Sequence, residues 1–312
     1  MTAAELLIDE LRPVSFAIAY RMLGSVADAE DVVQEALLRT HRAVEDGQQL
    51  DSPRAFVATV TTRLAIDELR SARARRELYV GDWLPEPIVT DRDDDPASQA
   101  ELADSLSIAM LRLLENLSPE QRATLLLRDV FDYGYAEIAE IIGKSEANAR
   151  QLAARARRHV DQGRPRFHTT REQRDELGRR FFAAARDGNL DELEALLAAD
   201  VSLTGDGGGK VPALARTIRG RTRVANTLRA WLKNRARVPG GSIREVGVNG
   251  APGALLLDGE GRLLGVWALE IVGTEITSIN SIVNPEKLGH IGPVADLGAV
   301  FRKLGIGIRE VS

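Results

Sequence analysis

The chain has 312 residues, of which 44% are hydrophobic and 28% are charged. At roughly 150 residues per domain, this length predicts two or three domains, each large enough for a core of its own. The absence of cysteine excludes disulfides, thiolate zinc sites, cysteine-ligated iron–sulfur clusters and thiol nucleophiles. The net charge of −5 hides a segregation of charge, because two arginine-rich stretches at residues 63–76 and 150–166 flank an acidic run across residues 82–104.

The N-terminus gives no sign of export. Its first ten residues carry acids where a signal peptide needs a basic start followed by an apolar run. No apolar stretch approaches the ~18 residues of a membrane span. We therefore expect a soluble cytoplasmic protein with no membrane partner.

The first quarter of the chain has a helical pattern. From Glu5 to about Glu77 apolar residues recur at three- and four-residue steps, and Ser52 followed by Pro53 is typical of a helix start. Within this stretch, residues 28–39 place an acid-rich polar set with one leucine on one helical face. Such a face suits a protein partner, although a solvated surface helix has the same pattern. The candidate partner-binding residues are Asp28, Asp31, Gln34, Glu35 and Leu38.

Residues 78–100 lose this periodicity and gain prolines and acids, which predicts a linker. Helical signals return afterwards and include a helix-turn-helix pattern near residues 135–160. Gly143 supplies its turn and Ser145 the N-cap of its second helix. A stripe of small apolar residues then faces inward, formed by Ala149, Ala153, Ala156 and Val160.

The outward face of this second helix carries side chains suited to duplex DNA. Asn and Gln can pair with adenine, and Arg can pair with guanine or hold a phosphate. An ordinary helical hairpin with a solvated arginine face remains the alternative. The candidate DNA-binding residues are Asn148, Arg150, Gln151, Arg155 and Arg158.

The pattern changes after Pro165. Two amphipathic helices (171–186 and 190–199) precede a strand at 201–204, a helix at 221–235 and strands at 242–248, 254–257, 264–272 and 276–283. Helices followed by a mostly antiparallel sheet predict an α+β domain. The expected divisions of the chain are therefore residues 1–77, 78–100, 101–165 and 170–312.

The all-α front half resembles the extracytoplasmic-function (ECF) sigma factors, the minimal two-domain promoter-recognition subunits of bacterial RNA polymerase. Residues 28–39 resemble the region 2 helix that docks on the polymerase clamp. Residues 52–76 resemble the helix that handles the −10 element, although Val57 follows Phe56 where the family often has Trp. Residues 117–160 resemble region 4, whose helix-turn-helix reads the −35 element.

The resemblance implies core RNA polymerase (its clamp and flap elements) and promoter DNA as partners. It also implies a role in transcription initiation under stress, a monomer when free, and no cofactor or metal. For the −10 element, the resemblance points to a polar pocket in the loop of residues 45–52, backed by a basic helix. The residues concerned are Arg63, Asp67, Arg70 and Arg73.

The back half resembles the SnoaL-like cone, the fold of polyketide cyclases, ketosteroid isomerase and nuclear transport factor 2. Three motifs, at residues 83–87, 206–210 and 284–288, resemble those of the ECF sigma-factor subgroup with a fused SnoaL-like extension. In that subgroup the extension is taken to modulate activity in cis. We expect the motifs to form one interdomain regulatory contact through Trp83, Pro85, Pro87, Asp206, Lys210, Asn284, Pro285 and Lys287.

Other interpretations of the back half remain open. Asp206 could serve as a general acid or base in the cone, the glycines beside it could hold an anion near Lys210, or the segment could be a plain turn. We expect no catalytic residue, and the four histidines lack metal-ligand spacing. The alternatives to a sigma factor are an isomerase, a cyclase or a ligand sensor tethered to DNA, and a one-component repressor. A small molecule of unknown identity could bind in the cone.

Overall fold

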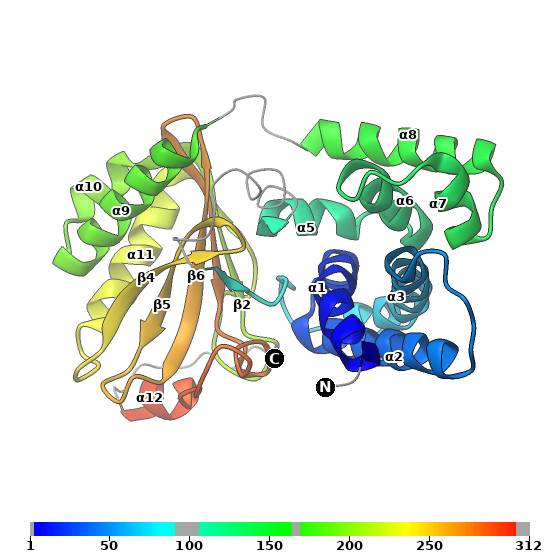
Figure 1. Cartoon of the computed structure of the whole chain (residues 1–312). Helices are drawn as coiled ribbons and strands as arrows, with labels where there is room; N and C mark the ends of the chain where they lie inside the picture. Colours follow the sequence, from blue (N-terminus) through cyan, green and yellow to red (C-terminus); the bar gives the residue numbers. More distant parts are fainter. Residues whose placement is uncertain (1–2, 91–105, 164–168, 304–312) are drawn as a thin grey trace. The chain divides into compact units, whose positions relative to one another are not determined.

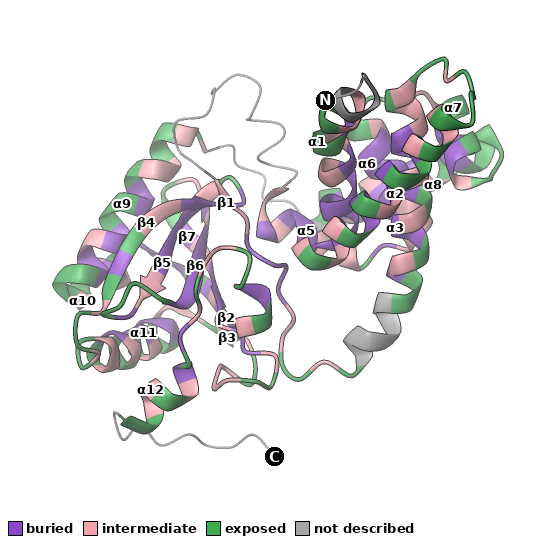
Figure 2. Ribbon diagram, turned by 60° about the horizontal axis from the view of Figure 1, so that its bottom comes forward, coloured by how far each residue is buried: buried purple, intermediate pink, exposed green. Residues whose placement is uncertain are grey.

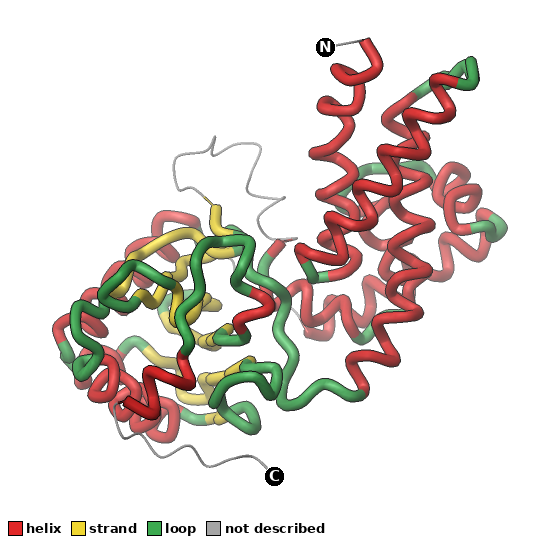
Figure 3. The backbone as a smooth tube through the Cα atoms, turned by 90° about the horizontal axis from the view of Figure 1, so that it is seen from below, coloured by secondary structure: helices red, strands yellow, loops and turns green. Residues whose placement is uncertain are grey.

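The computed structural model describes residues 3–90, 106–163 and 169–303. It divides into two compact units, one formed by residues 1–78 and 110–164, the other by residues 79–109 and 165–312. The first unit is helical, and the strands belong to the second unit (Figure 3).

The first unit begins with three packed helices, α1 (Ala3–Leu23), α2 (Val26–Glu45) and α3 (Pro53–Glu77). Gly24 ends α1 with a φ of 66°, and the hydroxyl of Ser25 caps α2 by accepting a hydrogen bond from the Asp28 amide. The apolar face of α2 is buried through Ala29, Val32, Val33, Ala36 and Leu37. This bundle corresponds to the first helical segment expected from the sequence.

Four shorter helices follow in the chain: α5 (Ile108–Glu115), α6 (Pro119–Asp129), α7 (Tyr135–Ile142) and α8 (Glu146–Gly163). Ser118 and Gln121 form a reciprocal capping box that starts α6. Gly143 adopts a left-handed φ of 66° between α7 and α8, as the turn of a helix-turn-helix requires. The small-residue stripe of α8 is buried, with Ala149, Ala153 and Ala156 fully enclosed and Val160 4% exposed.

The second unit is built on a seven-stranded sheet with the order β1-β4-β5-β6-β7-β2-β3. The strands are β1 (Val89–Thr90), β2 (Leu197–Asp206), β3 (Ile218–Arg219), β4 (Ser242–Val248), β5 (Ala251–Leu257), β6 (Leu263–Val272) and β7 (Glu275–Ile282). The pairing is antiparallel throughout, except that β2 runs parallel to β7. Asn249 and Gly250 join β4 to β5 with positive φ at both positions, as a two-residue hairpin turn requires.

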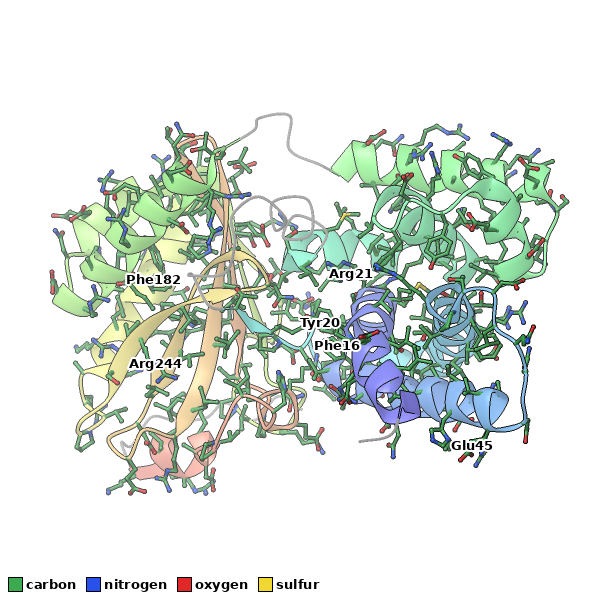
Figure 4. The ribbon with its side chains drawn as sticks, viewed as in Figure 1. Phe16, Tyr20, Arg21, Glu45, Phe182 and Arg244 are labelled. Atoms are coloured by element: carbon green, nitrogen blue, oxygen red, sulfur yellow. The ribbon has the colours of Figure 1, made fainter. Side chains whose placement is uncertain are left out.

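One face of the sheet is covered by α9 (Arg171–Asp187), α10 (Leu190–Ala195) and α11 (Arg221–Arg235) (Figure 1). Phe182 of α9 lies between that helix and the sheet (Figure 4) and belongs to a core that includes Phe181, Leu228 and Trp267. A 3₁₀ turn (Pro285–Lys287) and α12 (Leu297–Lys303) follow the last strand. The architecture is the α+β domain expected from the sequence, with its helices before and among the strands.

The opposite face of the sheet is covered by residues that the sequence assigned to a linker. Leu84 is fully buried and packs in one cluster with Ile108, Val266, Ile282 and Leu288. β1 extends the sheet by pairing with β4, Val89 opposite Val248. Residues 79–90 are therefore part of the second unit, and the division of the chain differs from the four segments expected.

A second difference concerns the strand that follows α10. The sequence predicts a helix to residue 199, whereas α10 ends at Ala195 and β2 begins at Leu197. Leu197 pairs with Ile276 of β7 and is fully buried. Pairing with a strand distant in sequence thus outweighs the local helical pattern.

Candidate functional site

α2 has exposed as well as buried positions along its length (Figure 2), and none of the candidate partner-binding residues is buried. Asp31 and Gln34 are exposed, and Leu38 is 42% exposed, which is unusual for a large apolar side chain in this protein. Glu35 accepts a hydrogen bond from Arg39, 2.7 Å away. Asp28 lies in the first turn of the helix, where its negative charge interacts favourably with the helix dipole. The structure brings these residues to one polar face with an apolar centre.

The candidate DNA-binding face of α8 is exposed to solvent. Its members all lie exposed along one helix, opposite the buried stripe: Asn148, Arg150, Gln151, Arg155 and Arg158. The Arg150 guanidinium stacks over the Tyr135 ring at 4.6 Å, which holds it near the start of the helix. Arg158 donates from Nε to the carbonyl of Ala154 at 3.2 Å. Amide and guanidinium donors thus line the first turns of an exposed helix.

Arg157 fixes the position of this helix, a role that the sequence did not reveal. Its guanidinium makes a bidentate pair with Asp129 of α6 and also reaches the hydroxyl of Tyr135. The hydrogen bonds that Arg157 donates to Asp129 raise the pKa of Arg157 above its usual value. In the sequence, Arg157 is one of six arginines in a basic run, and nothing local separates it from its neighbours.

The basic residues of α3 contact the helices that follow in the same unit. Arg63 donates from Nε to the carbonyl of Ile141 and from Nη2 to that of Glu140, both at 2.9 Å. These carbonyls lie at the C-terminal end of α7, where a cation complements the helix dipole. In this structure Arg63 therefore caps α7.

Arg70 makes similar contacts nearby on α3. It pairs with Asp67 at 3.0 Å and with Glu120 of α6 at 2.7 Å. The pair with Arg70 lowers the pKa of Glu120 below its usual value, despite the opposing effect of its partial burial. The side chain of Arg73 lies outside the described residues. The structure thus shows two candidate −10 arginines engaged within the unit. The loop at residues 46–49 is exposed.

The three motifs of the second unit meet around one buried carboxylate. Asp206 is fully buried at the end of β2 and accepts hydrogen bonds from the Tyr79 hydroxyl at 2.5 Å, the Leu84 amide at 2.8 Å and Lys287 Nζ at 2.7 Å. Asn284 donates to the Tyr79 hydroxyl at 2.9 Å. Because all three motifs contribute, we call Asp206, Tyr79, Leu84, Asn284 and Lys287 the Asp206 cluster.

Trp83 joins this cluster through its ring. The ammonium of Lys287 lies 4.2 Å from the centroid of Trp83 and 4.9 Å from that of Tyr79. Lys287 also donates to the carbonyl of Leu84. The flanking Pro85 and Pro87 are buried, and Pro285 starts the 3₁₀ turn that carries Lys287. A buried cation thus ties the segment at residues 83–87 to the end of the sheet.

The glycine run beside Asp206 forms a close turn against this cluster. Gly208 has a φ of 59°, and a Cβ there would lie 2.3 Å from Asn284 Nδ2. Lys210 lies outside the cluster, since it is half exposed and pairs with Glu286 at 2.9 Å. The run therefore packs against protein side chains.

Residues 79–90 make further contacts that the sequence did not predict. Asn249 accepts a hydrogen bond from the Ile88 amide at 3.0 Å and donates to the Leu106 carbonyl at 2.9 Å. Asp82 accepts from Thr217 at 2.8 Å, and His290 contacts the Pro87 carbonyl at 2.8 Å. Asn249 also belongs to the turn between β4 and β5, and its second role depends on partners more than 140 positions away.

The described residues contain no group of His, Asp and Glu side chains that could hold a metal ion. None of the helices in the described ranges is long and apolar enough to cross a membrane.

Comparisons with known proteins agree with this layout. The family profile for sigma-70 region 2 matches residues 7–75, and the profile for sigma-70 region 4 matches residues 107–160. The "ECF RNA polymerase sigma factor SigJ" of Mycobacterium tuberculosis is 38% identical over 288 residues, which cover 89% of this chain and 91% of the relative. The "Probable ECF RNA polymerase sigma factor SigI" of the same species is 34% identical over 291 residues, covering 90% and 92%.

A solved structure extends the likeness over nearly the whole chain. The crystal structure of the Mycobacterium tuberculosis extracytoplasmic function sigma factor SigJ has a TM-score of 0.73 and 35% sequence identity. It covers 94% of this chain and 100% of the other.

Proposed function

Because the chain belongs to the ECF sigma factors of RNA polymerase, we propose that it binds the core polymerase and directs transcription from its own set of promoters. The face of α8 carries this proposal. Five polar or basic side chains stand exposed on a helix that Arg157 holds in place. Asn148 and Gln151, in the first turns of α8, would read bases of the −35 element, while Arg155 and Arg158 would hold phosphates. A cytoplasmic location follows from this function.

The polymerase would dock on α2. The exposed Asp31 and Gln34, with the partly buried Asp28 and Glu35, would surround Leu38, and a polar rim around an apolar anchor is the usual anatomy of a protein interface. Region 4 would contact the flap. Neither contact needs a second copy of the chain, so the free protein would be a monomer.

The −10 element would be held by α3 and the loop before it. In the structure, Arg63 and Arg70 contact α7 and α6. Binding of single-stranded promoter DNA by these arginines, with Asp67 and Arg73, would therefore require that α3 separate from the region 4 helices. Docking on the polymerase would supply that separation.

The second unit would regulate this activity in cis. The Asp206 cluster holds residues 79–90 on the sheet, and these residues connect region 2 to region 4 in the chain. A change in the cluster would alter the path available to that connection. A small molecule bound in the second unit would be one input. The enzyme alternative is weaker, because Asp206, its candidate acid or base, is buried and ion-paired with Lys287.

Co-elution with core polymerase followed by promoter-specific run-off transcription tests the proposal. We expect Leu38→Ala to weaken polymerase binding at least tenfold, whereas Leu78→Ala, the matched exposed leucine, should leave it unchanged. Absence of co-elution by the unmodified chain would contradict the proposal.

Run-off transcription with Trp83→Ala and Asp206→Ala tests the regulatory part. Both substitutions weaken the hold of residues 79–90, so both should change the amount of transcript in the same direction. Unchanged transcription in both would remove the regulatory proposal and leave the sigma-factor function standing.

A further inference from the structure

A partly open cavity of about 330 Å³ lies on the helix-covered face of the sheet. Aromatic and aliphatic side chains form most of its wall. Trp231 of α11 and Trp267 of β6 lie against each other, with centroids 6.0 Å apart, and α12 adds Val300 and Phe301. The volume is at the lower end of the range for small-molecule sites, and such a mix of apolar walls with few polar groups is typical of them.

The polar groups of the cavity are all able to donate hydrogen bonds. Asn234 and Arg235 come from the last turn of α11, and Ser281 comes from β7. Ser281 accepts a bond from Trp267 Nε1 at 3.0 Å, which leaves its own hydroxyl hydrogen for another partner. Among the residues that line the cavity, none is acidic.

The guanidinium of Arg235 has few hydrogen-bond acceptors and no ion pair among the described residues. Its Nε is buried and has no acceptor among the described residues, and its Nη1 reaches the Gly241 carbonyl at 3.4 Å, a long hydrogen bond. Burial lowers the pKa of this group below its usual value. A partly desolvated cation without a counter-charge is costly, and an anion that reaches it regains that free energy.

We propose that this cavity binds a small organic carboxylate with a flat apolar body, its carboxylate on Arg235 and its body against Trp231 and Trp267. The planar fork of an arginine matches the two oxygens of a carboxylate. Donors from Asn234 and Ser281 suit an acceptor-only group, and the cavity lining has no acidic residue that could pair with an ammonium. This inference deepens the proposed regulation, because it gives the chemical class of the input.

Calorimetric titration of the full chain with 2-naphthoate tests the assignment, with the neutral 2-naphthamide as the matched probe. We expect the carboxylate to bind at least tenfold more tightly than the amide. Arg235→Gln should abolish this preference and Arg235→Lys should keep part of it. Arg229→Gln, which removes an exposed arginine of the same helix, should change neither titration.

A second substitution probes the apolar part of the site. Phe301→Ala should weaken the binding of 2-naphthoate and 2-naphthamide by the same factor, because it removes wall area and no charge. Equal binding of the two probes, no binding of 2-naphthoate, or a preference that survives Arg235→Gln would each overturn the proposal. The titrations need no polymerase, so failure of the sigma-factor function and failure of this site are distinguishable.

Discussion

Asp206 is the candidate acid or base of the sequence, and in the fold its carboxylate is fully buried and hydrogen-bonded. Three donors satisfy its carboxylate, and one of them, Lys287, carries the compensating charge. The sequence predicted that Trp83, Asp206, Asn284 and Lys287 would meet, and the structure brings them together. Tyr79 was missed because it lies outside the three motifs and no local pattern marks it.

Asp206→Asn should destabilise the second unit by about 3–5 kcal/mol, because it leaves the buried charge of Lys287 without its partner. Trp83, Trp231 and Trp267 are all the tryptophans of the chain and lie in this unit, so urea unfolding followed by tryptophan fluorescence reports on it. Lys210→Ala removes the half-exposed pair with Glu286 and should cost at most about 1 kcal/mol. Equal effects of the two substitutions would refute the role assigned to the cluster.

Neighbouring arginines of α8 should respond differently to substitution. Arg155→Ala should weaken promoter binding and reduce the slope of log affinity against log salt by about 1, with no loss of stability. Arg157→Ala should lower the stability of the first unit by about 1 kcal/mol, because it removes the charge-assisted bonds to Asp129. Fluorescence anisotropy on promoter DNA and thermal unfolding of the same samples separate the two effects.

At the scale of elements, the packing of α3 on α6 and α7 bears directly on DNA binding. Arg63 binds backbone carbonyls of α7, and a carbonyl acceptor leaves no mark in a sequence. The residues that resemble a −10 reader therefore also hold two helical segments together. Interactions of exposed ion pairs are weak, so a strong partner can break them.

Glu120→Ala should remove the pair of Arg70 with α6 and raise the affinity of the free chain for promoter DNA about two- to fivefold at low salt, the effect of a pair of about 0.3–1 kcal/mol. Glu140→Ala removes the same charge from an exposed site on α7 and serves as the control. A rise of equal size in both variants would mean that net charge alone governs the affinity.

The elements themselves were predicted unevenly. β4 and α11 match the expected ranges. A strand pattern that ends at turn residues marks β4, and a helical pattern marks α11. The two-residue strands β1 and β3 are too short to carry a pattern. The parallel pairing of β2 with β7 joins segments that no local rule connects. Family membership, in contrast, was predicted from the motifs and is confirmed by the relatives.

At the scale of the whole molecule, the described part of the expected linker, residues 79–90, belongs to the second unit. Leu84 enters its core, β1 enters its sheet, and Asn249 bonds to both Ile88 and Leu106. Proline and acid content suggested a linker because these residues are rare inside sheets. The fold accommodates Pro85 and Pro87 before the edge strand, where no ladder hydrogen bond is lost.

Hydrogen exchange can show whether this segment and the sheet unfold together. We expect amides of residues 84–90 to be protected as well as those of β4 and to lose protection with them in Asp206→Asn. Peptides from α8 in the first unit provide the internal control. Immediate exchange of residues 84–90 in the unmodified protein would contradict their place in the sheet.

The edge strand β1 has one more consequence. If β1 detaches, Gly247 and Val248 of β4 lose their ladder partners, and an exposed strand edge favours pairing with another chain. A signal that acted by detaching β1 from β4 would promote aggregation of the sigma factor in the cell. Natural selection should therefore favour signals that weaken the contacts of Trp83 and Tyr79 while β1 stays paired with β4. Variants that lack β1 should be recovered as insoluble protein.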